Sequence, residues 1–212
     1  MHRSPPDMES RLYGPQRIAA IVATLEEDGI APASTLAGSG IEEAALRDKA
    51  TRISYRQVET VFRNAMRLAS DPTVAFRAGA RMHLTAYGMY GYGLLSSPTH
   101  ADQVDFSMKY GRIYGPVAGA AAFTREGNVG VYAYEVLLTP DHTDDLYRFA
   151  LEFAYSTQLT LSRDLYGREF SFVSLRASCP APAHASLYPA LFGCPVQFGY
   201  RSDEVLIDMS WI

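Results

Sequence analysis

The sequence predicts an α+β domain in which an N-terminal helical layer packs on an antiparallel β-sheet with a long central helix. Two observations predict it. From residue 15 to about residue 114, apolar residues recur at helical spacing, and helix caps separate the segments. From residue 119 onward the apolar period shortens to two, and further helices lie between the strand segments. Helices that come first, followed by strands with helices between them, are typical of an antiparallel sheet.

Composition narrows the functional classes. Of 212 residues, 48% are hydrophobic and 20% charged, which is typical of a globular protein. The formal net charge of -4 argues against nucleic-acid binding by this domain itself. No apolar run reaches the roughly 18 residues of a membrane span, and the N-terminus lacks a signal peptide, so we expect a cytoplasmic protein without membrane contact. Two cysteines are too few for a disulfide framework.

The helical half divides at recognisable caps. We expect residues 1–14 to form a flexible arm and residues 15–212 a single domain, because no repeat or linker interrupts them. Ser54 with Gln57 forms a capping box, and Thr99 with Asp102 forms a weaker one. Helices are predicted over residues 15–28, 32–37, 42–46, 54–68, 71–80, 85–96 and 99–114.

The second half predicts the sheet. Residues 119–125 and 129–138 are predicted to form two strands joined by turn residues 126–128. The longest helix is predicted from Thr139-Pro140 to Gly167, and its apolar residues on two sides indicate a central position. A third strand over 169–176, a short helix over 184–191, and a final hairpin of 195–200 with 205–209 complete the prediction.

Common catalytic and cofactor motifs are missing. The sequence has no Walker loop, no HExxH and no G-x-S-x-G, and its glycine-rich run at residues 88–93 does not match a dinucleotide fingerprint. Cys179, His184 and Cys194 lie close in sequence, but their spacing fits no common zinc pattern, so we predict half-buried thiols and a surface histidine. We therefore expect no enzyme activity, no cofactor and no metal site.

Tyrosines are the most distinctive candidates. Tyr87, Tyr90 and Tyr92, with Tyr110 and Tyr114 downstream, could form a pocket wall, although a helix–helix contact is the more common role of such a cluster.

Several single charged residues have two possible roles each. Glu135 could anchor a ligand or face solvent, and Arg176 could hold a ligand carboxylate or lie at a rim. His83 is expected to be a hydrogen-bonded histidine rather than a ligand. The pairs Arg63 with Arg67 and Arg77 with Arg81 predict solvated helix faces, with partner docking as the alternative.

Six segments resemble a known family in their order and spacing. They are residues 29–32 (GIAP), 51–57 (TRISYRQ), 71–79 (DPTVAFRAG), 85–97 (TAYGMYGYGLLSS), 182–188 (PAHASLY) and 192–198 (FGCPVQF). Together they resemble the N-terminal effector-binding, arabinose-binding-like domain of AraC-family bacterial transcription regulators, in the subfamily of ornithine-utilisation and VirS-type regulators. The resemblance covers the chain from about residue 15 to its end.

The resemblance implies a sensor that binds a small organic effector, forms a homodimer and controls a DNA-binding domain. Such regulators carry that domain C-terminally as two helix-turn-helix units. This sequence stops at Trp211-Ile212, just after the last predicted strand, so we expect a trimmed fragment that lacks it. The fold also resembles, more distantly, haem-based nitric-oxide sensors and vinyl-reductase-like sensor domains. Because Tyr200-Arg201-Ser202 does not match the Tyr-x-Ser-x-Arg motif of the haem sensors, we expect no haem.

The main prediction is an effector cavity between the helical layer and the sheet. The residues predicted to line it are Tyr87, Tyr90, Tyr92, Tyr132, Tyr134, Phe172 and Arg176. One alternative is a ligand-free dimerisation module, which an interior without a cavity of roughly 300 Å³ would favour. The other is an enzyme acting on a small aromatic or acyl substrate, for which Glu135 with His83 is the pair that the sequence suggests.

Overall fold

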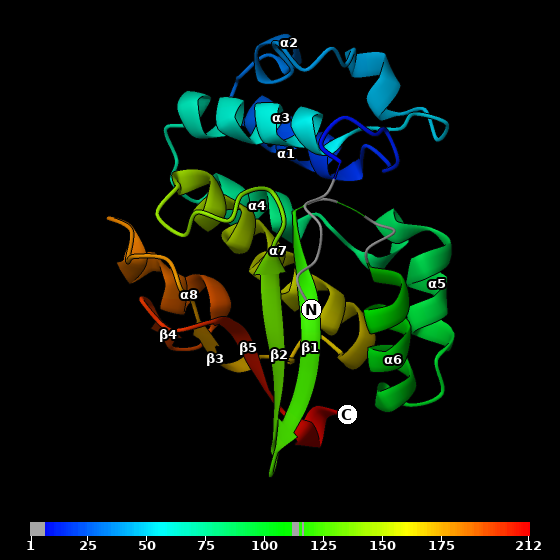
Figure 1. Cartoon of the computed structure of the whole chain (residues 1–212), viewed down its shortest axis with the longest axis vertical. Coiled ribbons are helices and arrows are strands. Elements are labelled where there is room, and N and C mark those ends of the chain that lie inside the picture. The colour runs from blue at the N-terminus through cyan, green and yellow to red at the C-terminus, as the bar shows by residue number, and fades with distance from the viewer. Residues whose placement is uncertain (1–6, 112–114, 116) are drawn as a thin grey trace.

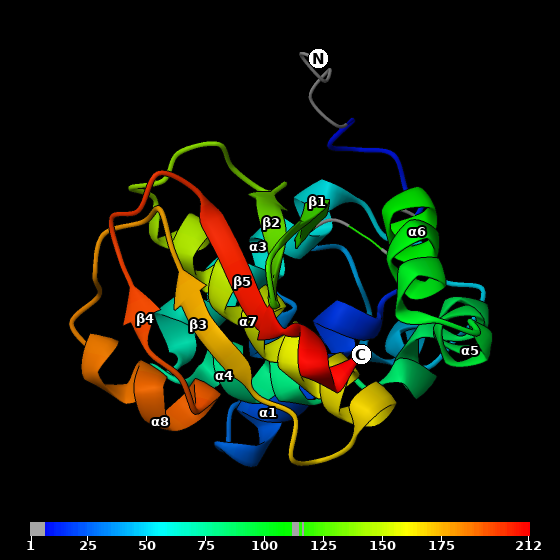
Figure 2. The same ribbon diagram turned by 90° about the horizontal axis from the view of Figure 1, so that it is seen from below.

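The fold stacks helices in layers on one side of a twisted sheet (Figures 1 and 2). The computed structural model describes residues 7–111, 115 and 117–212. The helices are α1 (Gln16–Glu27), α2 (Pro32–Thr35), η1 (Glu43–Leu46), α3 (Tyr55–Leu68), α4 (Val74–Ala80), η2 (Leu84–Tyr87), α5 (Met89–Ser96), α6 (His100–Tyr110), α7 (Asp145–Tyr166), η4 (Ala185–Leu187), α8 (Tyr188–Phe192) and η5 (Met209–Trp211). The strands are β1 (Ala118–Glu126), β2 (Val129–Val136), β3 (Phe172–Arg176), β4 (Val196–Gln197) and β5 (Asp203–Asp208).

The N-terminal helices form the predicted layer. The capping box of α3 is confirmed: the Gln57 N–H donates to Ser54 Oγ at 3.3 Å, and the Ser54 N–H donates to Gln57 Oε1 at 3.1 Å. The stripe of α3 that includes Phe62 is buried against α1 and α7. In the described part of the predicted arm, the Tyr13 N–H donates to the Ile53 carbonyl at 3.2 Å, so residues 7–14 contact the start of this layer.

The predicted helix over residues 85–96 is wrong in one respect, because the chain breaks it at Gly88. This glycine has φ 51° and ψ -128°, a backbone conformation that residues with a Cβ rarely adopt. The segment therefore forms η2, then a turn, then α5. The next helix begins at the predicted cap, where the Asp102 N–H donates to Thr99 Oγ1 at 3.2 Å. It ends at Tyr110, and residues 112–114 lie outside the described part of the chain.

The sheet corrects the predicted final hairpin. Its strand order is β1-β2-β5-β3-β4, so β3 lies between the two strands that the sequence paired. β5 pairs antiparallel with β2 and β3, whereas β4 pairs parallel with β3. The physical reason is burial: Val205 and Ile207 in β5 are almost fully inaccessible, which suits a central strand, while the two-residue β4 lies at the edge.

The central helix α7 begins later than predicted. The Asp141 carboxylate instead accepts hydrogen bonds from the Thr143 N–H and hydroxyl, which holds a turn, and Asp144 caps the helix by accepting from the Leu146 N–H at 2.9 Å. The 22 residues of α7 end at Tyr166 with Gly167 as the C-cap, as expected, and pack against α4 on one side and β1 and β2 on the other. This central placement brings one face of α7 under the first two strands.

Candidate ligand-binding cavity

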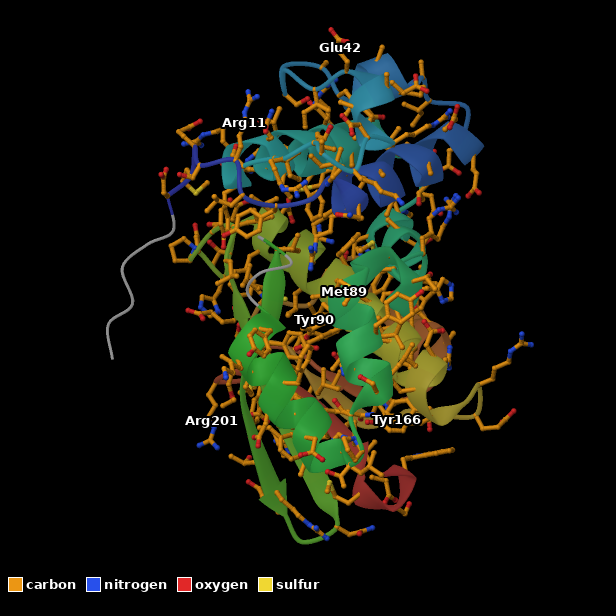
Figure 3. The ribbon with its side chains drawn as sticks, turned by 90° about the vertical axis from the view of Figure 1, so that its right-hand side faces the viewer. Arg11, Glu42, Met89, Tyr90, Tyr166 and Arg201 are labelled. Atoms are coloured by element: carbon orange, nitrogen blue, oxygen red, sulfur yellow. The ribbon has the colours of Figure 1, made fainter. Side chains whose placement is uncertain are left out.

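A cavity of about 170 Å³ lies between the sheet, α7 and a pair of helices at one side of the molecule. Helices α5 and α6, together with the short η2 that precedes them, span residues 84–111 and are called the α5–α6 flap. The polar side chains that line the cavity are Arg17, Tyr87, Tyr90, His100, Gln103, Ser107, Tyr132, Tyr134, Glu135, Thr157, Gln158, Ser162 and Tyr166. Figure 3 looks onto this side and labels Met89 and Tyr90 at the start of α5 and Tyr166 at the end of α7.

Two glycines make the flap compact. A Cβ at Gly91 would lie 2.1 Å from the Leu84 carbonyl oxygen, and one at Gly93 would lie 2.3 Å from the ring of Phe106. Only glycine lets η2 and α6 approach α5 this closely. Helices α5 and α6 therefore form a unit whose inner side chains cover the cavity and whose α6 touches β1.

A chain of hydrogen bonds joins the flap to the body of the domain through His100. The Tyr132 hydroxyl lies 3.3 Å from His100 Nε2, and His100 Nδ1 lies 2.7 Å from the Tyr166 hydroxyl. Tyr166 in turn donates to Gln103 Oε1. We call these four residues the His100 network. It connects β2, α6 and α7, so the position of α6 depends on groups that line the cavity.

Burial keeps the network uncharged. The pKa of His100 is lowered from its ordinary 6.5, because burial outweighs the hydrogen bond to Gln103. Burial also raises the pKa of Tyr166 to about 12, and it raises the pKa values of Tyr132 and Tyr134 well above the ordinary 10.0. At neutral pH this wall consequently presents neutral hydroxyl, imidazole and amide groups on an aromatic surface.

Charged lining residues lie elsewhere on the wall. The Arg17 guanidinium lies 5.6 Å from the centre of the Tyr87 ring. Arg17 and Glu135 both act electrostatically on the Tyr55 hydroxyl, whose pKa is raised first of all by burial, so both charges lie near Tyr55. The cavity thus combines a charged region with a neutral, hydrogen-bonding one.

Four of the seven residues predicted to line the cavity do lie on it: Tyr87, Tyr90, Tyr132 and Tyr134. Their hydroxyls and rings are close together, since Tyr87, Tyr90 and Tyr132 all act on the Tyr134 hydroxyl. The turn at Gly88 determines which tyrosines of the flap face the cavity.

The structure places the other three away from the cavity. Tyr92 is 67% exposed on the far face of α5, together with Met89 and Leu95. Phe172 is buried in the core beside Phe170, with ring centres 5.8 Å apart.

Arg176 is held at the sheet surface instead. Its Nη1 lies 2.6 Å from Glu204 Oε2, and its guanidinium lies over the Tyr200 ring. Of the remaining tyrosines in the predicted cluster, Tyr110 packs on Phe106 at 4.9 Å, and Tyr114 lies outside the described residues.

Sequence reasoning missed several lining residues. His100 follows the predicted cap at Thr99, but nothing local shows that the first turn of α6 faces the sheet. Gln158, Ser162 and Tyr166 recur at intervals of four along the predicted central helix. A polar stripe on a buried helix is a signal that could have found them, because buried polar groups need partners.

The other candidate sites do not assemble. His83 is exposed and bonds Asp164 at 3.0 Å, and it does not line the cavity that Glu135 lines. His184 is partly buried rather than on the surface, and it bonds Glu152 at 3.0 Å. Both cysteines are buried. Within residues 7–111, 115 and 117–212, no three His, Cys, Asp or Glu side chains form a group that could hold a metal.

Both arginine pairs contain a residue that is ion-paired across elements rather than simply solvated. Arg77 bonds Asp28 at 2.8 Å and Asp71 at 2.9 Å, which ties α4 to the end of α1. Arg63 bonds Asp144 at 2.9 Å, at the cap of α7. These contacts hold the layers together and have no direct role at the cavity.

The volume limits what the cavity can hold. At about 170 Å³ it is smaller than the roughly 300 Å³ at which ligand pockets for drug-sized compounds begin. At about 30 Å³ per water molecule, it has room for about six water-sized groups. The arrangement can bind a compact polar molecule.

The chain is similar to a set of transcriptional regulators. The family model described as the arabinose-binding domain of AraC transcription regulator, N-terminal, matches residues 29–212. The ornithine utilization regulator of Pseudomonas aeruginosa is 24% identical over 179 residues, which is 84% of this chain and 52% of that protein. An uncharacterised HTH-type transcriptional regulator of Mycobacterium tuberculosis is 31% identical over 113 residues, which is 52% of this chain and 32% of that protein.

A solved structure shares the fold. The transcriptional regulator CdpR from Pseudomonas aeruginosa superposes with a TM-score of 0.65 at 15% identity, over 93% of this chain and 56% of that one. This likeness shows the α+β fold, as predicted. The chain therefore spans about half the length of the first of its curated relatives and of this structural neighbour. No helix in the described part of the chain has both the length and the apolarity that a membrane span requires.

Proposed function

Because the chain belongs to the family of N-terminal arabinose-binding domains of AraC transcription regulators, we propose that it senses a small organic effector in the cavity beneath the α5–α6 flap. The single observation that carries the proposal is the His100 network. Four polar side chains from β2, α6 and α7 line one cavity and are linked there by a chain of hydrogen bonds. A purely structural core has little need of so many buried and partly buried polar groups, which stabilise a fold less than apolar packing does.

Effector binding would act through the flap. A ligand shifts a conformational equilibrium only by its differential affinity for the two states. The flap contributes Tyr90, His100 and Gln103 to the wall, so a ligand that bonds these groups favours one flap position over another. The outer face of α5 moves with them and carries the change to the surface.

The complete regulator is part of the proposal. The ornithine utilization regulator is about twice as long as the region that it shares with this chain, so we propose that this domain controls a DNA-binding domain in a longer protein. It would not be an enzyme and would not touch nucleic acid itself. We also propose a homodimer, which the exposed apolar side chains Met89, Tyr92 and Leu95 on α5 support. Light scattering that finds only monomer at high concentration would remove the dimer.

A thermal-shift screen tests the sensing function. Amino acids, fatty acids and aromatic acids are each added to the 212-residue chain, and a specific ligand raises the unfolding midpoint by mass action. Ala154→Leu places extra methyl groups in the cavity wall on α7 and should abolish the shift. Ala80→Leu makes the same change at an exposed position on α4, away from the cavity, and should preserve it.

The ligand-free dimerisation module is the second candidate, and the small cavity volume is the observation that favours it. If no compound in the screen changes the midpoint while light scattering shows a stable dimer, this candidate replaces the sensor. A shift that Ala154→Leu leaves unchanged would mean that the ligand binds elsewhere.

A further inference from the structure

We propose that the cavity selects a ligand with a hydrogen-bond-donating head, a protonated primary amine, over the same molecule with a carboxylate in that position. This inference rests on the proposed sensing function and adds the chemical class of the group that the wall recognises. It follows from which hydroxyl, imidazole and amide protons of the lining side chains already form hydrogen bonds within the protein.

The direction of each hydrogen bond in the His100 network follows from one main-chain carbonyl. Gln103 Nε2 donates to the Leu94 oxygen at 3.4 Å, which turns Gln103 Oε1 toward Tyr166. Tyr166 must therefore donate its only proton to that oxygen and accept from His100 Nδ1–H. His100 Nε2 is then the bare nitrogen and accepts from the Tyr132 hydroxyl. The oxygen of Tyr132 is left with lone pairs and no proton to offer.

Some of the other lining hydroxyls repeat the pattern, whereas Ser162 accepts a hydrogen bond from Gln158 Nε2 at 3.4 Å. Three further lining hydroxyls donate to protein acceptors: Tyr134 to Gln158 Oε1 at 2.9 Å, Ser107 to the Val104 carbonyl at 2.9 Å and Thr157 to the Gly79 carbonyl at 3.4 Å. A hydroxyl has one proton and two lone pairs, so each of these oxygens can still accept. Gln103 and Gln158 keep one amide N–H each, so the acceptor positions on this part of the wall outnumber the donor positions.

Aromatic faces favour the same head group. The rings of Tyr87, Tyr90, Tyr132 and Tyr134 line the cavity, whereas the Glu135 carboxylate lies in the charged region with Arg17. A cation gains from aromatic faces and from acceptor oxygens, whereas a carboxylate gains from neither. Among the lining residues that the structure describes, Arg17 is the only permanently cationic side chain, and it lies against Tyr87, away from the His100 network. The amine is therefore expected at the tyrosine hydroxyls of the His100 network.

The experiment compares matched probes that differ only in the head group. The first pair is 4-aminobutanoate and pentanedioate, which share one carboxylate and have an amine or a second carboxylate at the other end. The second pair is n-butylamine and pentanoate. Affinities are measured by isothermal titration calorimetry on the whole chain, with thermal shift alongside. The amine of each pair should bind at least about tenfold more tightly than its carboxylate partner, as expected for a hydrogen bond to a charged group.

A variant tests the predicted contact. Tyr132→Phe removes the accepting oxygen and keeps the ring, and it should weaken amine binding by about tenfold. Tyr92→Phe makes the same change on the exposed face of α5 and should leave the affinity unaltered. If Tyr132→Phe does not fold, as judged from its unfolding midpoint without probe, Tyr134→Phe takes its place.

The outcomes separate the two proposals. Carboxylates that bind as tightly as their amine partners, or an amine affinity that neither tyrosine variant changes, would overturn the amine selectivity. Binding of other compounds from the effector screen, with no binding of either amine, would overturn it too and leave the sensing function standing. No binding of any compound in either panel would remove both.

Discussion

Gly79→Ala should destabilise the domain, although alanine is the better helix former. Gly79 lies in α4 where this helix crosses α7. A Cβ there would lie 2.5 Å from the Phe153 carbonyl oxygen and 2.8 Å from Ser156 Cβ. The first obstacle is main chain in the middle of α7, so it cannot rotate away as a side chain would. The two helices must separate.

The size of the effect follows from three contributions. Alanine in place of glycine favours a helix by about 1 kcal/mol. Overpacking against fixed backbone opposes it by about 3 kcal/mol, the upper part of the usual range. Separation also strains the bonds from Ser156 Oγ to the Phe76 carbonyl, at 2.7 Å, and from Thr157 to the Gly79 carbonyl, which adds about 1 kcal/mol. The net loss of unfolding free energy is about 3 kcal/mol.

Chemical and thermal unfolding measure it directly. For a chain of this size the midpoint should fall by about 6–12 °C. Gly111→Ala is the matched control, because Gly111 has helical backbone angles and, among the described residues, the nearest atom to its new Cβ would be the Tyr90 hydroxyl oxygen, at an ordinary 3.6 Å. That variant should be slightly stabilised, by about 0.5 kcal/mol. A Gly79→Ala protein as stable as the wild type would refute the close crossing of α4 and α7.

Three further perturbations have defined outcomes. Because burial lowers the pKa of His100 below 6.5, its neutral form contributes stability above about pH 6.5, and this stability is lost as the pH falls through the lowered pKa. The difference in unfolding free energy between the wild type and His100→Gln, measured by urea unfolding, should therefore shrink over that pH range. A difference that stays constant would contradict this. Burial raises the pKa of the Cys179 thiol to about 12 and that of the Cys194 thiol to about 11. At pH 8 both thiols should therefore react with a disulfide reagent only after the protein unfolds, and rapid labelling of the native protein would contradict this. Glu152 is 2% exposed and forms an ion pair with Arg148 at 3.0 Å, so Glu152→Gln should lower the free energy of unfolding by about 2–3 kcal/mol, as measured in urea. An unchanged free energy of unfolding would show that this ion pair does not stabilise the fold.

Local features of the fold could be predicted from the sequence because they depend on neighbouring residues. The capping box at Ser54 and the cap at Thr99 need only three or four residues to form, and both are present. The change of apolar period at residue 119 predicts the first two strands to within a few residues. Apolar residues on two sides of the long helix predict its central position, since a helix covered on both faces needs both to be apolar.

The candidate cavity could be predicted only in part. Tyr87, Tyr90 and Tyr92 look equivalent in sequence, yet the turn at Gly88 starts α5 in an orientation that leaves Tyr90 on the cavity wall and Tyr92 in solvent. Phe172 and Arg176 share a strand with the right composition, but that strand pairs at the far side of β5.

The sequence by itself determined the fold class, most helix boundaries and the family, because periodicity, caps and ordered motifs are properties of short stretches of chain. Only the tertiary structure decided the strand order and brought His100 to Tyr166, 66 residues further along. The physical reason is that burial and hydrogen-bond satisfaction act between segments remote in sequence. Which strand becomes central, and which polar groups meet in one cavity, is settled when all layers pack together.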